Sequence, residues 1–232
     1  MNKTLRIAVA VLAGSMALLA GGCVSGLRSH QPAQQQYVLV LPSAGGAAAT
    51  ANPAAAANGN AAGAASSSTL QVLLPLAGAG LGTDGIAVMR PGQRLDYYNG
   101  ARWAAPAPAM LQALAVEALR RQGRFALVEP EGGPFDARYV LSLTLTHFEA
   151  DYSGAGPPTV RVALLCTLGR RAAHTVAASF TVHSAVTADA DRMQAVVAAF
   201  ERASGAALTR LAAQLVPPAA PAAPAAPAPE AP

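Results

Sequence analysis

The sequence predicts a single α/β domain of the α+β kind, in which a mostly antiparallel mixed β-sheet packs against two long amphipathic helices. Apolar and polar residues alternate along three stretches of the second half of the chain, 139–146, 160–168 and 176–182, which is typical of strands with one buried face. Apolar residues also recur at helical spacing after Pro106 and after Asp189.

Large parts of the 232-residue chain lack the apolar side chains that a core requires. Residues 43–68 are nearly all Ala, Gly, Ser and Asn, and residues 217–232 are almost entirely Ala and Pro. We therefore expect the domain to span 37–216, with 43–68 as a disordered insertion and 217–232 as a disordered tail. An alanine-rich helix is the alternative for the insertion, but its glycines, Pro53 and three consecutive serines disfavour it.

The first half of the domain begins with two predicted strands. Residues 37–41 form the first and end at Pro42, and residues 69–77 form the second, where Pro75 indicates an edge or a bulge. Residues 80–85 then match the GxGxxG phosphate-binding pattern. That pattern needs a helix directly after it, whereas a strand and a turn follow here, so a glycine-rich loop is expected.

The densest structural signal lies in residues 86–128. The pair Pro91-Gly92 predicts a turn that joins 86–89 to 94–98 as a hairpin, and Asn99-Gly100 predicts a second turn. A helix should begin near Pro106 and Pro108 and end at Gly123, with Glu117 one turn before Arg121, and a strand should follow. The expected buried stripe of that helix contains Leu111, Leu114, Ala115, Ala118 and Leu119.

The second half predicts a three-stranded meander and a closing helix. Tyr139, Leu141, Leu143 and Leu145 should face the core in the first strand. Cys166 lies on the apolar face of the second, which predicts a buried, inert thiol. The third strand should bury Val176, Ala178, Phe180 and Val182. Asp189 is the expected N-cap of the helix, whose buried stripe contains Met193, Val197, Phe200, Ala207, Leu211 and Leu215.

Composition disfavours several classes of function. Without residues 1–22 the formal charge falls to +2, from 14 arginines against 12 acids, and the arginines are scattered, so no nucleic-acid surface is indicated. No two of the four histidines have metal-ligand spacing, and no nucleophile elbow occurs. We therefore expect neither catalysis nor a metal site nor a cofactor.

The N-terminus has the pattern of an export signal. Lys3 and Arg6 precede an apolar run over 7–20 that is too short for a membrane span. The sequence Leu-Ala-Gly-Gly-Cys that ends at Cys23 resembles a bacterial lipobox. The resemblance implies a signal peptide over 1–22, a lipid anchor on Cys23 and a lipidated stalk over 23–36. Val24 in place of aspartate implies sorting to the periplasmic face of the outer membrane.

With Cys23 lipidated, Cys166 would have no cysteine left with which to form an intramolecular disulfide.

The central segment resembles the ABC-type transport auxiliary lipoprotein family. The residues that carry the resemblance are Tyr97, Tyr98, Arg102, Trp103, Pro106, Leu111, Leu119, Gly123, Phe125 and Val128. The resemblance implies a non-catalytic accessory of an MCE-type ABC lipid transport system that docks the conduit to the outer membrane. The implied partners are an MCE-domain protein of the inner membrane with its permease and ATPase, and further copies of the chain in a ring.

Two questions stay open at this stage. Tyr97, Tyr98, Arg102 and Trp103 are candidates for a partner interface, because Trp and Arg are frequent interface anchors. The alternative is that Trp103 packs on the helix and the core. The function also has an alternative, in which the lipoprotein binds a lipid or another small hydrophobic ligand in a pocket between helix and sheet.

Overall fold

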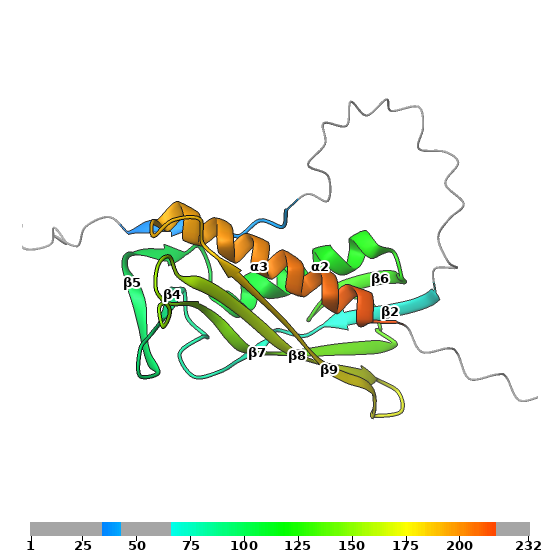
Figure 1. The fold of residues 1–232 in the computed structure, drawn as a ribbon. Helices are drawn as coiled ribbons and strands as arrows, with labels where there is room; N and C mark the ends of the chain where they lie inside the picture. Colours follow the sequence, from blue (N-terminus) through cyan, green and yellow to red (C-terminus); the bar gives the residue numbers. More distant parts are fainter. Residues whose placement is uncertain (1–33, 43–65, 217–232) are drawn as a thin grey trace, which may run out of the picture. The chain divides into compact units, whose positions relative to one another are not determined.

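The computed structural model describes residues 34–42 and 66–216 (Figure 1). The described strands are β1 (Gln35–Tyr37), β2 (Ser66–Val72), β3 (Leu76–Ala77), β4 (Gly85–Arg90), β5 (Arg94–Trp103), β6 (Phe125–Pro130), β7 (Tyr139–Asp151), β8 (Thr159–Arg170) and β9 (Thr175–Thr187). The described helices are α2 (Ala107–Gln122) and α3 (Met193–Gln214). The expected insertion and tail lie largely outside these residues, but Ser66–Ser68 belong to β2, so the strand begins earlier than predicted.

All described strands join one mixed sheet that is organised around β7. On one side, β7 pairs along its whole length with antiparallel β8, and β8 pairs in the same way with β9. On its other side, β7 pairs in succession with β2, β3 and β4, all parallel to it. Strand β6 extends this sheet beside β2, while β5 and β1 extend it beside β4. This confirms a mostly antiparallel mixed sheet with two helices.

The β7–β9 meander is confirmed, with Tyr139, Leu141, Leu143 and Leu145 all buried. Strand β7 runs further than the predicted 139–146, and its register shifts between Leu145 and His147. A bulge of this kind reverses which side chains face the core. Phe148 therefore packs against Phe200 of α3 with ring centroids 5.0 Å apart.

Helix α2 has the predicted boundaries. Gly123 has a left-handed φ of 64°, and Arg121 pairs with Glu117 at 3.7 Å. Helix α3 begins later than predicted, at Met193, and Asp189 is not its N-cap. The Ala188 amide donates to Pro158, so pairing beside β9 continues past its end, and residues 189–192 form bends before the helix. The Asp189 carboxylate pairs with Arg202 at 3.2 Å instead of capping the helix.

The predicted strand over 37–41 is displaced. Pairing stops at Tyr37, and residues 38–42 have no strand partner in the described residues. They still alternate, because Leu39 and Leu41 are buried while Val38 and Val40 are exposed. Pro42 lies on α3, where a Cβ on Gly205 would come within 3.0 Å of its ring. Packing on a helix has thus replaced sheet pairing.

Three further expectations need correction. Pro75 divides the predicted strand over 69–77 into β2 and β3, which pair with different parts of β7. The pair Asn99-Gly100 forms a bulge inside β5 and not a turn, with a φ of 73° at Gly100. Val176 is 64% exposed and not in the core, although Val182 is buried as predicted.

Candidate functional site

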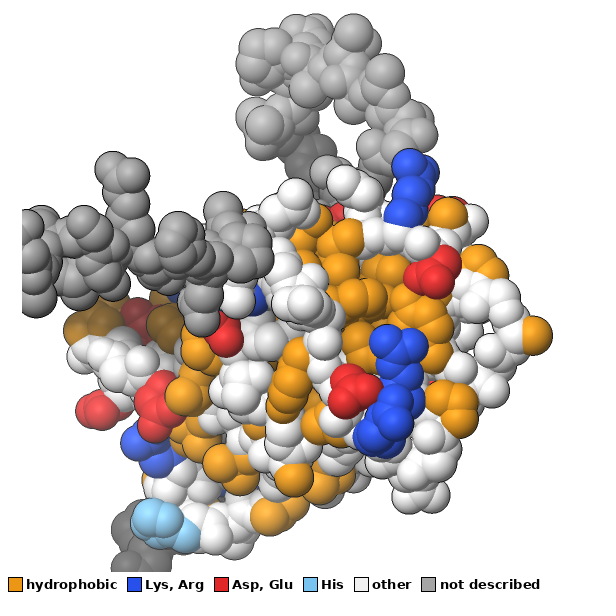
Figure 2. All heavy atoms as spheres, turned by 90° about the vertical axis from the view of Figure 1, so that its left-hand side faces the viewer, with side chains coloured by type: hydrophobic (Ala, Val, Ile, Leu, Met, Phe, Trp, Pro, Cys, Tyr) orange, Lys and Arg blue, Asp and Glu red, His pale blue; other side chains and the backbone are white. Residues whose placement is uncertain are grey.

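The candidate interface residues all come from β5 but do not share one surface. Tyr97 is 44% exposed, Tyr98 and Arg102 are half-buried, and Trp103 is fully buried. We use the name β4–β5 corner for β4, β5 and the loop over 78–84. Figure 2 views the side on which β1 and β5 lie and shows hydrophobic patches with arginine and acidic side chains among them.

The glycine-rich loop of the corner packs against aromatic and aliphatic side chains. The Tyr97 hydroxyl donates to the Gly80 carbonyl at 2.7 Å. A Cβ on Gly80, whose φ is +79°, would lie 2.2 Å from the Leu95 side chain, and a Cβ on Gly85 would lie 2.5 Å from the Tyr97 ring. Strand β4 follows the loop directly, so the loop does not lead into the helix that the phosphate-binding pattern requires. Close packing explains these glycines without a phosphate.

Arg102 and its neighbour connect the loop to the end of β5. The Arg102 guanidinium pairs with the Asp84 carboxylate at 3.3 Å, with both side chains partly exposed. The Trp103 amide donates to the Asp84 carbonyl at 2.7 Å, and the Ala107 amide donates to the Thr83 carbonyl at 3.1 Å. One loop therefore fixes both the strand end and the start of α2.

Trp103 lies at the centre of an aromatic cluster in the core, as the packing alternative predicts. Its ring centroid is 5.1 Å from that of Phe200 in a T-shaped arrangement and 5.8 Å from that of Phe148. The indole Nε1 is buried and has no hydrogen-bond partner among the described residues. Apolar packing therefore holds this side chain in place.

Tyr98 belongs to a hydrogen-bonded chain that joins three distant elements. Its hydroxyl contacts the Tyr152 hydroxyl at 2.7 Å, and Tyr152 donates to the Asp191 carboxylate at 2.5 Å. The Arg90 guanidinium lies 4.9 Å from the centroid of the Tyr152 ring. Sequence reasoning missed Tyr152 and Asp191, because their separation from Tyr98 leaves no pattern to read.

Burial raises the pKa of Tyr98, although its hydrogen bond with Tyr152 acts in the opposite direction. The pKa of Tyr152 is also raised, first by burial and then by its hydrogen bonds to Asp191 and Tyr98. Both hydroxyls therefore remain protonated well above neutral pH and can keep donating hydrogen bonds.

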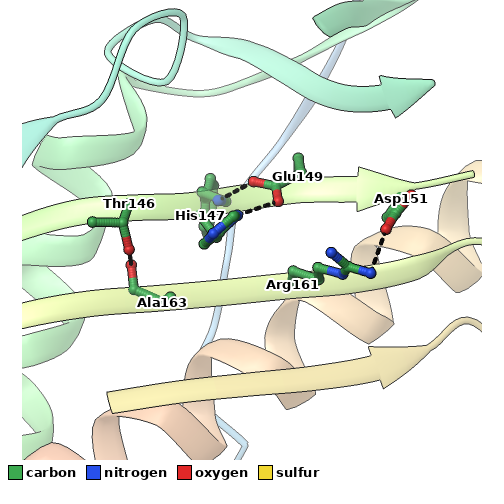
Figure 3. A network of polar contacts seen from close by, with 7 residues as sticks. Thr146, His147, Glu149, Asp151, Arg161 and Ala163 are labelled. Carbon is green, nitrogen blue, oxygen red and sulfur yellow. Dashed lines mark hydrogen bonds and ion pairs between the residues drawn. The ribbon is translucent and has the colours of Figure 1, made fainter. Parts of the chain in front are cut away.

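A second polar cluster lies at the end of β7 (Figure 3). Glu149 is 3% exposed, and its carboxylate contacts His147 Nδ1 at 2.7 Å and accepts the Phe148 amide at 2.6 Å. Asp151 pairs with Arg161 at 2.7 Å. Burial alone would raise the pKa of Asp151, but hydrogen bonds from Ser153 and the charge of Arg161 together lower it.

Neither cluster has the composition of a metal centre. In residues 34–42 and 66–216, no group of three or more His, Cys, Asp or Glu side chains could hold a metal ion. Cys166 is buried, and burial raises the pKa of its thiol to about 12, so it is protonated at neutral pH. The predicted burial of this thiol is confirmed. Neither α2 nor α3 is long and apolar enough to cross a membrane.

An apolar groove of about 500 Å³ lies between α2, α3 and the extended segment before residue 43. Leu41, Leu208 and Ala212 supply apolar lining, and Arg121 and Arg202 lie at the groove. Each of these arginines already pairs with an acid, Glu117 and Asp189 respectively. The groove could accept an apolar chain, with the partly exposed guanidinium of Arg121 or Arg202 beside it for an anionic head group.

Comparison with known proteins identifies relatives of this fold. The family described as ABC-type transport auxiliary lipoprotein component matches residues 50–216. A crystal structure of a protein from Xanthomonas campestris is similar, with a TM-score of 0.58 and 31% sequence identity, and the match covers 62% of this chain and 81% of that one. No curated protein matches the sequence.

Two other solved structures resemble the chain more distantly. One is an uncharacterised protein with a TM-score of 0.54 and 16% identity, covering 63% of this chain and 91% of that one. The other is the PelC dodecamer from Paraburkholderia phytofirmans, with a TM-score of 0.40 and 15% identity, covering 62% of this chain and 85% of that one. The first supports the fold alone, and the second is too dissimilar to support an argument about this chain.

Proposed function

Because the chain belongs to the ABC-type transport auxiliary lipoprotein family, we propose that it serves an MCE-type lipid transport system of the cell envelope. In this proposal a lipid on Cys23 anchors the protein to the periplasmic face of the outer membrane. The folded domain docks the transport conduit there without catalysing a reaction. The family match over residues 50–216 carries the proposal, and the lipobox pattern before Cys23 supports it.

The proposed partner is an MCE-domain protein anchored in the inner membrane. Its permease and ATPase would supply the energy for transport, while this chain provides the contact with the outer membrane. We further propose that several copies form a ring around the conduit. The transport role comes from the family, whereas the structure supports a specific docking surface.

We assign docking to the β4–β5 corner. Tyr97 combines an exposed ring with a hydroxyl held by Gly80, and Arg102 is partly exposed beside Asp84. Tyrosine and arginine are common interface anchors, and anchors that are already held in place lose little entropy on binding. Trp103 lies beneath them and would act as rigid support, with Tyr98 fixed by Tyr152.

Site-specific photocrosslinking in cells tests this surface. A photoreactive residue at Tyr97 should capture the MCE-domain protein, whereas one at the exposed Ala172, in the β8–β9 turn, should not. Equal capture at both positions, or none at Tyr97, would contradict the docking surface. The family assignment would be unaffected by that outcome.

The lipid anchor is tested separately with Cys23→Ala. The variant should lose incorporation of labelled palmitate and should leave the outer-membrane fraction in a density gradient. A single acyl chain holds a protein only marginally, so anchoring should depend on the full lipid modification. Unchanged labelling of Cys23→Ala would refute the anchor.

The groove between α2 and α3 favours a second candidate function, in which the chain binds a lipid or another small hydrophobic ligand. Its lining is largely apolar and its volume of about 500 Å³ could accept an acyl chain. Lipid that co-purifies with a monomeric protein, and that is lost when Ala206→Trp fills the groove, would support this function over docking. Absence of lipid from both proteins would argue against it.

A further inference from the structure

Strand β9 forms a long edge of the sheet with little to prevent further pairing. Among the described residues it pairs only with β8, although it runs for 13 residues. It contains no proline, no lysine and no acid, and His183 is its only titratable residue. Natural edge strands are usually blunted by charges, prolines or short length. This edge is therefore suited to pairing with another strand.

The odd-numbered residues of β9 direct their backbone groups toward the free edge. The side-chain oxygens of Thr159 and Thr187 lie 3.1 Å apart, and those of Thr167 and Ser179 lie 3.3 Å apart. Such close approach is typical of antiparallel pairs that do not exchange backbone hydrogen bonds. The N–H and C=O groups of Ser179 and Thr181 should therefore point away from β8.

Two arginines of α3 cover the second half of this edge. Arg210 donates to the His183 carbonyl, and Arg202 donates to the Thr187 carbonyl at 3.4 Å. No corresponding hydrogen bond occurs at Ser179 or Thr181 in the residues that the structure describes. The open part of the edge therefore lies near Phe180.

The apolar side chains of the open half are incompletely covered. Val176 is 64% exposed, and Phe180 is half-buried. A helix advances about 1.5 Å per residue and a strand about 3.3 Å, so α3, which reaches His183 at Arg210, ends near Thr181. Val176 lies beyond it. This end of β9 has apolar side chains that the described residues do not bury.

The other edges of the sheet do not offer a matching surface. Strand β6 is short and ends in Glu129-Pro130, and β1 has only three residues. Proline and charge are the devices that prevent edge pairing. An uncharged edge meets no electrostatic repulsion from an identical edge, so the best match for β9 is β9 of a second copy.

We propose that two copies of this chain pair through their β9 strands, antiparallel and about a two-fold axis at Phe180. Ser179 would then face Thr181 of the partner subunit, and the two Phe180 rings would cover each other. This isologous contact would extend the sheet across both copies. It does not depend on the proposed docking role.

A cysteine at the axis provides a direct test in cells that express the full chain. Residues opposite each other without shared hydrogen bonds have Cα atoms about 4.5 Å apart, within disulfide range. Cys166 of β8 lies directly opposite position 180 and would compete for the new thiol within one chain, so both cysteine variants also carry Cys166→Ala. In that background Phe180→Cys should form a disulfide-linked dimer of the chain. Ala185→Cys is the matched control, because the proposed register places its two copies roughly 30 Å apart. Equal dimer from both variants, or none from Phe180→Cys, would overturn the proposal.

A second measurement uses the purified full chain in detergent. Thr181→Lys and Thr181→Pro should lose the dimer that light scattering detects for the wild-type chain, because a charge or a missing N–H blocks the edge. Ala185→Lys should keep the dimer, and circular dichroism should show all three variants folded. A wild-type chain that is monomeric at every concentration, or a folded Thr181→Pro dimer, would contradict the pairing. Capture of a different protein at position 180 would also contradict it.

Discussion

The β4–β5 corner and the β9 edge differ in how many of their polar groups and apolar side chains have partners within one chain. At the corner, Tyr97 has a hydrogen-bond partner, Arg102 has an ion-pair partner, and the glycines leave room for the packed side chains. At the β9 edge, Val176 is exposed and the outward backbone groups near Phe180 have no described partner. Most side chains of the corner are therefore held within the monomer, although the buried Arg102 Nε and Trp103 Nε1 have no partner among the described residues. The β9 edge instead leaves backbone groups and an apolar side chain for a second chain to cover.

The largest expected effect on stability comes from removing the buried side chain that supports the corner. Trp103→Ala should lower the free energy of unfolding by about 3–5 kcal/mol, because it leaves a cavity between Phe148 and Phe200. Urea denaturation followed by circular dichroism measures the change. Tyr97→Ala is the control at an exposed position and should have a smaller effect. Equal losses would mean that Trp103 does not support the corner from the core.

A smaller effect is expected at the glycine-rich loop. Gly80→Ala should cost about 1–3 kcal/mol, because its Cβ would overlap the Leu95 side chain and its φ is positive. Gly82→Ala is the matched control, since its Cβ would make an ordinary contact of 3.6 Å with Ala77. The melting temperatures of both variants separate the effect of the overlap with Leu95 from the general effect of replacing a glycine. Similar melting temperatures would contradict this account.

The tyrosine pair should give a pH-dependent effect. Tyr152→Phe should cost about 1–2 kcal/mol, because it removes hydrogen bonds to Tyr98 and Asp191. The pKa values of both tyrosines are raised in the folded state, so their contribution to stability is present below pH ~10 and is lost as the pH rises further.

Denaturation series at pH 8 and above pH ~10 measure that dependence. The wild-type chain should lose more stability over this range than Tyr152→Phe, which cannot ionise at position 152. Identical pH profiles would show that the raised pKa of Tyr152 does not contribute to folding.

The smallest expected effect on stability is at Arg210, which covers part of the β9 edge. Arg210→Ala removes an exposed side chain from the His183 carbonyl and should change unfolding by less than about 1 kcal/mol. It should nevertheless strengthen association of the chain, because the open edge becomes longer. Sedimentation at several concentrations measures this change, and weaker association would contradict the role assigned to Arg210.

Local sequence patterns predicted much of the fold. The alternation from Tyr139 to Leu145 predicted the buried face of β7, and Gly123 predicted the end of α2. The burial of Cys166 followed from the same alternation in β8. These predictions succeeded because each depends on residues within one or two turns or on the strand's own period.

The errors occur where a distant partner decides the local structure. The bulge at Asn99-Gly100 depends on pairing with β4, and the late start of α3 depends on the contact between Ala188 and Pro158. The chain from Tyr98 to Asp191 joins residues that share no sequence pattern. Sequence reasoning therefore placed the aromatic residues of the corner but not the partners that hold them.

The sequence by itself determined the α+β class, the helix–strand order and the resemblance to the auxiliary lipoprotein family. Periodicity, helix-stop residues and motif spacing are local properties, so they are visible along the chain. Only the tertiary structure decided that Trp103 is buried while Tyr97 is exposed, and that β9 has an open edge at Phe180. Exposure depends on which elements cover a side chain, and α3 ends before it covers Val176.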